Sequence, residues 1–243
     1  MIPKDHPRYR SLVTRERLAA AAREGIVAME GLTAHGRGEA FDYLIGERTT
    51  ETARQAERIA AAILKQAKHP VISVNGNTAA LAAAEIAELQ EACGALVEVN
   101  LFHRTEHRVR QIEEVLTHAG VRVFSGPAEQ LLPLSHDRAW CRREGMYAAD
   151  VILVPLEDGD RAEALVKMGK TVIAVDLNPL SRTARSASLT IVDELTRALP
   201  GISRAYRELT ADECTRLIAD LDNNYLLQEA IREMIKRLTD VLD

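Results

Sequence analysis

The sequence predicts an α/β protein: a Rossmann-like, mostly parallel sheet flanked by helices, with a helical N-terminal part and C-terminal helices. Two observations lead to this class. In the middle of the chain, short β-branched runs alternate with helix-length segments, which is typical of βαβ units. Both ends of the chain instead carry long stretches with apolar residues at helical spacing. We expect a single domain, residues 1–243, made of a helical part (1–68), the core (69–200) and terminal helices (201–243).

The N-terminal part is predicted to hold two helices. Residues 14–30, "TRERLAAAAREGIVAME", begin at Thr14, a good N-cap, and Gly31 follows their end. Residues 49–67 form a second helix with a regular apolar stripe. The segment between them, "HGRGEAFDYLIGE", has two glycines within four residues, and we expect a loop with a short turn.

The middle of the chain is predicted to form six strands, and the tail to form helices. The expected strands are 70–74, 95–102, 121–126, 149–156, 171–177 and a run beginning at 188. The helix after the sixth strand has Asp193 as its expected cap. Thr210 and Glu213 match a capping box. A turn is expected at 223–224, before the last helix.

Composition excludes several classes of function. The net charge of -5 argues against general nucleic-acid binding, which needs a basic surface. No window is long and apolar enough to span a membrane, and no signal peptide is visible, so we expect a cytoplasmic location. Cys93, Cys141 and Cys214 are far apart and lack zinc-site spacing, which favours reduced structural thiols.

Two short motifs resemble nucleotide-binding fingerprints but do not fit them. "MGKT" at 168–171 lacks the required earlier glycine, because that position is Ala164, and it precedes a predicted strand instead of following one. "GRGEAF" has Phe41 at the third glycine position and follows a helix. A nicotinamide-dependent oxidoreductase therefore loses its main support.

Polar residues follow the predicted strands, at the sheet edge where ligands of parallel sheets bind. Asn75, Gly76 and Asn77 form a strand-to-helix turn that either binds an anion or only satisfies local geometry. His103 and Arg104 follow the next strand, where Arg104 can hold a carboxylate or phosphate, and His103 is either a donor or a capping residue.

The last strand ends carry acids and further cations. Glu157 and Asp158 can hold Mg²⁺ or a substrate ammonium, or simply start a helix. Asp176 can accept ribose hydroxyls, and the backbone near Leu177 together with Asn178 can read a purine edge. Arg182 and Thr183 supply a cation and a hydroxyl for phosphates.

The N-terminal part adds further basic residues. Arg37 lies between two glycines, and if Arg15 converges with it, the two make one wall of a polyanion pocket. Such a pocket can hold a triphosphate and stabilise a phosphoryl-transfer transition state. His35 and Gly36 in the same segment are expected to contact substrate.

The chain resembles the archaeal-type phosphopantothenate synthetases, also called 4-phosphopantoate–β-alanine ligases. The resemblance rests on long blocks spread from the N-terminus to about residue 198: "IPKDHPRY", "HGRGEAFDYLIGE", "KHPVISVNGN", "VNLFHRTEHRV", "ADVILVPLEDGDRAEALVKMGKTVIAVDLNPLSRTA" and "TIVDELTRA". It implies a homodimeric enzyme of coenzyme A biosynthesis. Such an enzyme joins 4-phosphopantoate and β-alanine with ATP and Mg²⁺, through a pantoyl adenylate, giving 4'-phosphopantothenate, AMP and diphosphate.

The resemblance also implies site residues. Its ATP contacts fall on Arg15, Arg37, Asp176, Leu177, Asn178, Arg182, Thr183, Glu194 and Leu195. Arg37 and Arg15 are the expected catalytic cations. His103, Glu157 or Asp158 would orient or deprotonate the amine of β-alanine, and the sequence does not select one base or any magnesium ligand. The rival interpretations are the oxidoreductase and a non-catalytic nucleotide-binding module.

Overall fold

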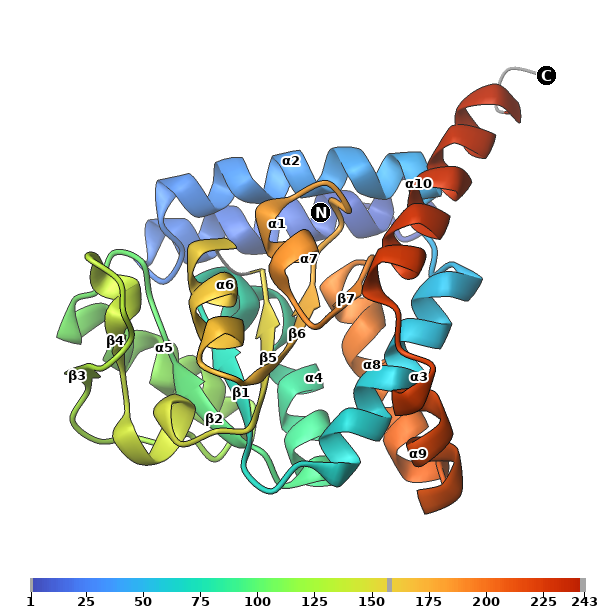
Figure 1. The fold of residues 1–243 in the computed structure, drawn as a ribbon. Coiled ribbons are helices and arrows are strands. Elements are labelled where there is room, and N and C mark those ends of the chain that lie inside the picture. The colour runs from blue at the N-terminus through green and yellow to red at the C-terminus, as the bar shows by residue number, and fades with distance from the viewer. Residues whose placement is uncertain (1, 157–158, 241–243) are drawn as a thin grey trace.

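The structure is a computed structural model that describes residues 2–156 and 159–240. Within these ranges the centre of the molecule is a five-stranded parallel sheet in the order β2-β1-β5-β6-β7 (Figure 1). The strands are β1 (Pro70–Val74), β2 (Leu96–Val99), β5 (Val151–Pro155), β6 (Thr171–Val175) and β7 (Leu189–Ile191). The predicted parallel α/β sheet is confirmed. The chain reverses its direction of winding between β1 and β5, the point where doubly wound folds bind ligands.

Helices surround the sheet. They are α1 (Tyr9–Arg23), α2 (Met29–Ile45), α3 (Glu51–Gln66), α4 (Gly76–Cys93), α5 (Glu106–His118), α6 (Gly159–Lys167), α7 (Arg182–Ser186), α8 (Leu195–Glu208), α9 (Ala211–Ala219) and α10 (Asn223–Asp240). Figure 1 shows α1 and α2 together across one end of the sheet, and α10 extending away from it. No described helix is both long enough and apolar enough to cross a membrane.

Alternating side chains on the strands build two separate apolar layers, because successive residues of a strand point to opposite faces. Ile72 and Val74 of β1 belong to the larger cluster, formed with α3, α4, α5 and α8. Val71 of the same strand packs in the smaller cluster, with α6 and residues from 132 to 149. Both faces of the sheet are thus buried, so ligands can reach it only at the ends of the strands.

The first predicted helix has the wrong bounds. Helix α1 covers Tyr9–Arg23, so Thr14 lies inside it and is not an N-cap. It ends because Gly25 adopts a φ of 79°, a left-handed conformation that costs glycine little. The amides of Ile26 and Val27 then bond back to the carbonyl of Ala21, and the chain turns into α2.

The segment 35–47, predicted as a loop, is helical. Helix α2 runs from Met29 to Ile45 and ends at Gly46, which is left-handed with a φ of 86°. Gly36 and Gly38 therefore sit in a helix interior, where each costs about 1 kcal/mol relative to alanine. The prediction failed because contacts with distant parts of the chain stabilise this helix, as described below.

The strand predicted at 121–126 is reduced to one bridge, between Val123 and Val97. The amide of Phe124 still donates to the carbonyl of Val97 at 2.8 Å, but Pro127 has no N–H to continue the pairing. The chain then makes a small antiparallel pair that the sequence did not predict, β3 (Glu129–Gln130) with β4 (Trp140–Cys141).

Two local predictions in the last third are off by a few residues. Glu194, not Asp193, is the N-cap of α8, because its side chain accepts a hydrogen bond from the amide of Thr196. Residues 223–224 begin α10 and do not form a turn. The capping box of Thr210 and Glu213 is confirmed, with both reciprocal hydrogen bonds present.

Candidate active site

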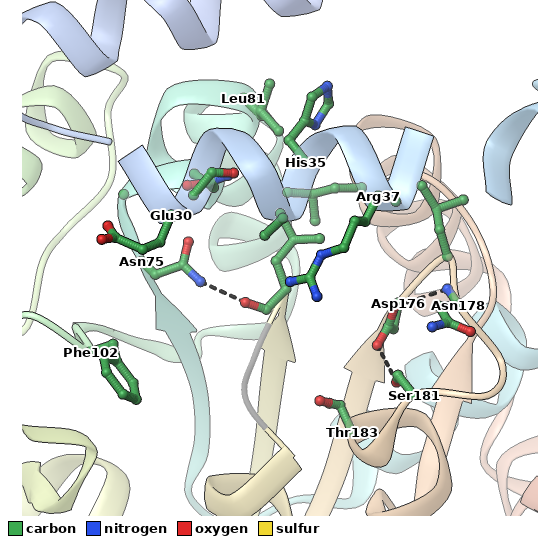
Figure 2. Close-up of a pocket in the computed structure, with 18 of the residues that line it drawn as sticks. Glu30, His35, Arg37, Asn75, Leu81, Phe102, Asp176, Asn178, Ser181 and Thr183 are labelled. Carbon is green, nitrogen blue, oxygen red and sulfur yellow. Dashed lines mark hydrogen bonds between the residues drawn. The ribbon is translucent and has the colours of Figure 1, made fainter. Parts of the chain in front are cut away.

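A cavity of about 780 Å³ lies at the carboxyl ends of the parallel strands (Figure 2). Residues that follow each of the five strands line it, and α2 forms its opposite wall. These strand-end residues are Asn75–Asn77 after β1, Leu101–His103 after β2, Leu156 after β5, Asp176–Asn178 after β6 and Asp193–Leu195 after β7. Leu156 has a φ of 53°, a strained conformation of the kind that clusters at functional sites. The volume is within the usual range for small-molecule pockets.

Asp176 lies at the β6 end of the cavity and is held by its own loop. Its Oδ1 accepts a hydrogen bond from the amide of Asn178 at 2.9 Å, and its Oδ2 accepts one from the Ser181 hydroxyl at 2.5 Å. Burial raises the pKa of Asp176, while the bond from Ser181 and the nearby charge of Arg37 act against that rise. The loop of residues 176–181 thus presents a fixed carboxylate to the cavity.

The predicted phosphate-binding pair after this loop also lines the cavity, with Leu177 and Asn178. Arg182 and Thr183 begin the short helix α7, which Ser181 caps by accepting from the amide of Ala184 at 2.9 Å. The Arg182 guanidinium is 60% exposed and pairs with Asp160 at 2.6 Å, so it can turn towards an anion at little cost.

Glu194 and Leu195 line the same side of the cavity. The carboxylate of Glu194 accepts from both the amide and the hydroxyl of Thr196, at 2.8 and 2.5 Å. Burial raises the pKa of Glu194, and the two bonds from Thr196 offset only part of that rise. This carboxylate is therefore engaged in capping α8.

Helix α2 brings Arg37 over the strand ends. Figure 2 shows the Arg37 side chain reaching from α2 towards the strand ends, between Asn75 and Asp176, while the ring of His35 points away from the strands. Both residues line the cavity. Burial lowers the pKa of His35, which keeps the ring neutral near pH 7. Arg37 is thus the cation of α2 that faces the strand ends.

The turn of Asn75, Gly76 and Asn77 lines the cavity, but much of its polar capacity is used by the protein. The Asn75 amide donates to the carbonyl of Leu156, and its oxygen caps α4. Asn77 donates to the carbonyl of Gly31 at 2.8 Å. A Cβ at Gly76 would lie 2.1 Å from the carbonyl oxygen of Ile26, so this glycine makes room for backbone.

The β2 end of the cavity has cations that the sequence analysis missed. Arg108 and Arg138 line it beside His103. The Arg108 guanidinium donates to the carbonyls of Ile26 and His103, so it ties the entry of α2 to this edge. Arg138 lies 5.9 Å from the Phe102 ring centroid, and the ring of His103 meets Phe102 edge-on at 4.9 Å.

Three predicted residues lie outside the cavity. Arg15 is on α1 and binds the Glu39 carboxylate at 2.8 Å, with its side chain 45% exposed. Gly36 is exposed on α2 and does not line the cavity, with no atom within 4 Å of where its Cβ would be. Arg104 pairs with Glu106, and its amide donates to Asp137. Glu157 and Asp158 lie outside the described residues.

The sequence analysis did not select several other lining residues. They include Glu30, Gly31, Leu81, Leu101, Phe102, Arg108, Arg138, Leu156, Ser181 and Asp193. Ser181 carried a usable signal, because it follows Asn178 in the polar stretch after β6. Arg108 and Arg138 carried none, since they belong to a helix face and a long connection that only the fold brings to the strand ends.

The described residues contain no group of three or more His, Cys, Asp or Glu side chains that could hold a metal ion. Magnesium in phosphoryl-transfer sites is commonly held by substrate phosphates and one or two carboxylates. The expected Mg²⁺ would therefore depend on a bound nucleotide for most of its ligands. Cys93, Cys141 and Cys214 are free thiols.

The fold and cavity define an α/β protein with a small-molecule site at the switch point of a parallel sheet, with arginines from several elements around it. A family model for phosphopantothenate/pantothenate synthetase matches residues 52–237. The chain belongs to this family. The match begins within α3, so α2 and its Arg37 lie before it.

Curated relatives match the chain over almost its whole length. A protein of Methanospirillum hungatei is 58% identical over 243 residues, which is 100% of both chains. A protein of Methanosarcina mazei is 53% identical, covering 98% of this chain and 95% of its own. One of Thermococcus kodakarensis is 49% identical, covering 98% and 94%. Each of these relatives is named 4-phosphopantoate–beta-alanine ligase.

Proposed function

We propose that this chain is the ATP-dependent ligase that joins 4-phosphopantoate to β-alanine, giving 4'-phosphopantothenate, AMP and diphosphate in coenzyme A biosynthesis. The names of the relatives support the substrates, and family membership supports the amide-forming reaction. The observation that carries the proposal is the single cavity at the ends of all five strands. Its β6–β7 side suits a nucleotide, and its β1–β2 side suits a second anion.

The β6–β7 side would hold ATP. Asp176 would accept hydrogen bonds from ribose hydroxyls, and the backbone near Leu177 together with Asn178 would contact the purine. Arg182, Thr183 and Arg37 would then contact the phosphates, as charge-assisted hydrogen bonds worth about 1.5–3 kcal/mol each. Mg²⁺ bound to those phosphates would supply further positive charge.

The β1–β2 side would hold phosphopantoate. Arg108 and Arg138 would take the anion-binding role that the sequence analysis gave to Arg104, because they line the cavity and Arg104 does not. The N-terminus of α4 directly follows β1, so it belongs to this side, and it favours an anion. Leu101 and Phe102 offer an apolar surface for the carbon skeleton beside these charges.

The reaction would run in two steps. A carboxylate oxygen of phosphopantoate attacks the α-phosphorus, the bond to the β-phosphate oxygen breaks, and diphosphate leaves. The β-alanine nitrogen then attacks the acyl carbon, the bond to the AMP oxygen breaks, and the nitrogen loses a proton. Arg37 would stabilise charge on the phosphates in the first step. Of the three predicted proton acceptors, His103 is the one within the described residues, and it lines the β2 end of the cavity.

The direct test is product analysis with ATP, phosphopantoate and β-alanine. We expect AMP and diphosphate in equal amounts, and amide only when β-alanine is present. Arg37→Ala should lower kcat by roughly 100-fold or more, since one preorganised charge contact is worth about that factor. Arg207→Met, an exposed ion-pair residue of α8, is the control and should keep full activity. Binding of ATP without AMP formation would instead indicate a non-catalytic nucleotide-binding module.

The adenylate has its own test. When the phosphopantoate carboxylate carries ¹⁸O, the label should appear in AMP, because that oxygen bridges the acyl carbon and the α-phosphorus. Label in inorganic phosphate together with ADP formation would replace the adenylate by an acyl phosphate.

We also propose a cytoplasmic homodimer. The last turns of α10 support a second copy, because Ile235 and Leu238 are each 56% exposed on one helix face. Light scattering after size-exclusion chromatography should give twice the chain mass. Ile235→Glu with Leu238→Glu should shift that mass towards the monomer if α10 forms the contact.

A further inference from the structure

Helix α2 carries Arg37 but has little intrinsic stability. Gly36 and Gly38 flank Arg37, and glycine is among the weakest helix formers. Its N-cap position, Ala28, makes no side-chain capping bond. Short isolated helices are marginal even with better sequences. The position of Arg37 must therefore come from what holds α2 to the rest of the molecule.

One attachment is near the N-terminal end of α2. The Asn77 amide donates to the carbonyl of Gly31 at 2.8 Å, and a Cβ at Gly31 would come within 2.2 Å of the Asn77 oxygen. The helix is thus seated directly on the first turn of α4. This contact fixes α2 six residues before Arg37.

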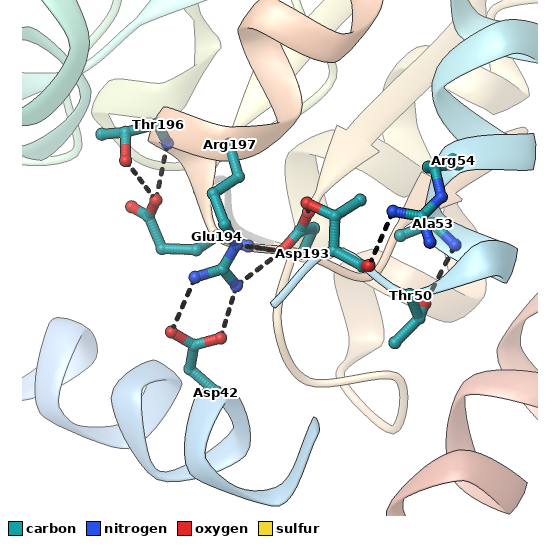
Figure 3. Close-up of polar contacts among 9 residues, drawn as sticks. Asp42, Thr50, Ala53, Arg54, Asp193, Glu194, Thr196 and Arg197 are labelled. Carbon is teal, nitrogen blue, oxygen red and sulfur yellow. Dashed lines mark hydrogen bonds and ion pairs between the residues drawn. The ribbon is translucent and has the colours of Figure 1, made fainter. Parts of the chain in front are cut away.

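The C-terminal end of α2 packs Ile45 against α10, and Arg197 of α8 adds a polar attachment there (Figure 3). Its Nη2 and Nη1 donate to the two carboxylate oxygens of Asp42 at 2.5 and 3.1 Å. Its Nε and Nη2 donate to Oδ1 of Asp193, at 2.8 and 2.6 Å. Thr49 donates to the other oxygen of Asp193 at 2.6 Å. One guanidinium thus joins α2 to the end of β7.

These groups are well shielded from solvent. The side chain of Arg197 is 19% exposed, that of Asp42 12% and that of Asp193 0%. Burial alone would lower the pKa of Arg197, but the hydrogen bonds and charges of Asp42 and Asp193 outweigh it and raise that pKa. The guanidinium therefore stays charged throughout the working pH range.

The geometry links this attachment to the cavity. Asp193 itself lines the cavity, whereas Arg197 and Asp42 do not. Asp42 follows Arg37 by five residues, or about 7.5 Å along the helix axis. A shift of about 1 Å in a catalytic group can cost roughly 100-fold in rate. Loosening the C-terminal end of α2 would therefore displace Arg37.

We propose that Arg197 is a positioning residue of the reaction: by clamping Asp42 to Asp193 it holds α2 so that Arg37 faces the nucleotide side of the cavity. The inference rests on the proposed function for its activity readout. Its structural part, the clamping of α2, is independent of which reaction the cavity supports.

The activity test is a double-mutant cycle with Arg37. Asp42→Asn removes the charge of the clamp but keeps its shape, and Arg197→Met removes the clamp. Each should lower kcat by about 10-fold to 100-fold, with the KM for β-alanine changed less than about 2-fold. In the Arg37→Ala background, the same substitutions should lower kcat by less than about a further 2-fold, because the side chain that they position is absent. Arg197→Lys, which restores charge without the paired geometry, should recover activity only in part.

The structural test is hydrogen exchange of the same variants, read by mass spectrometry. Asp42→Asn should speed exchange in the peptide covering α2 at least several-fold, with that of α3 unchanged. Arg207→Met, on the same helix as Arg197, should change neither peptide nor activity.

Either of two results would overturn the proposal. One is unchanged hydrogen exchange of α2 in both clamp variants. The other is a fall in kcat as large in the Arg37→Ala background as in the wild-type background. Wild-type protein that forms no AMP would overturn the proposed function instead, and hydrogen exchange would still decide whether Arg197 clamps α2.

Discussion

Helices α2 and α3 are of similar length and follow each other directly, but they are stabilised in opposite ways. Helix α3 has a capping hydroxyl at Thr50 and a regular apolar stripe that packs in the main core. Helix α2 lacks a side-chain cap, contains Gly36 and Gly38, and is held by Asn77 and Arg197 from elsewhere in the chain. The helix that carries Arg37 is the one whose position depends on tertiary contacts, while its neighbour provides stability.

The largest effect on stability is expected in the core of α3. Ile59 is 1% exposed within the main apolar cluster. Ile59→Ala should lower the free energy of unfolding by about 2–5 kcal/mol, because it removes buried methyl groups and leaves a cavity. Urea denaturation of the two proteins gives the difference. A loss below about 1 kcal/mol would mean that α3 is not the stabilising partner in the comparison.

The next effect depends on pH and concerns Glu57, which is buried in α3 against Gly201 of α8. Burial, with a further contribution from the charge of Asp193, raises the pKa of Glu57 from 4.5 to about 7. Between these two values the folded state binds more protons than the unfolded state. Glu57 therefore lowers stability progressively as pH rises through this window, by up to about 3 kcal/mol.

Glu57→Gln removes that ionisation. Its gain in unfolding free energy over wild type should be larger at about pH 8 than at about pH 5, where the carboxyl is mostly protonated in the folded state. Thermal or urea unfolding of both proteins at the two pH values measures it. An equal difference at both values would show that Glu57 does not titrate in this window.

A smaller effect is expected at the start of α3. Thr50 accepts a hydrogen bond from the amide of Ala53 at 3.1 Å. Thr50→Ala should cost about 1 kcal/mol of unfolding free energy, the usual loss for an N-cap. Thr50→Ser keeps the acceptor and is the matched control, so an equal loss in both variants would assign the effect to the lost methyl group.

The smallest effect is expected in α2 and has the opposite sign. Gly36 is helical, and a Cβ there would meet no atom within 4 Å. Gly36→Ala should therefore raise the unfolding free energy by about 0.4–1 kcal/mol and leave ligase activity unchanged. Denaturation and AMP formation measure the two results. A loss of activity with unchanged stability would return Gly36 to the substrate site.

Much of the core could be predicted because its signals are local. The runs at 70–74, 149–156 and 171–177 correspond to β1, β5 and β6. Thr210 and Glu213 form the predicted capping box of α9. The strand-end rule then selected Asn75, Asp176 and Arg182 for the cavity without any coordinates. The strands and the capping box are confirmed because their signals lie within a few residues of each other.

The failures share a physical cause. The stretch after α1 was predicted to be a loop because glycine weakens a helix. Contacts with Asn77, 46 residues from its partner Gly31, and with Arg197, 155 residues from its partner Asp42, hold it helical. Arg15, expected from its charge and from the family resemblance, and Arg104, expected from its charge, both lie outside the cavity and pair with Glu39 and Glu106. A cation's partner depends on the surface that it faces, which spacing along the chain does not define.

The sequence by itself determined the alternation of strands and helices, the parallel sheet and the edge at which polar residues gather, because these follow from local propensity and the period of apolar side chains. Only the tertiary structure decided that residues 29–45 are a helix, that Arg37 faces the strand ends, and that Arg108 and Arg138 complete the cavity. Those outcomes depend on contacts between distant segments, whose free energy is gained only when the sheet and its helices have packed.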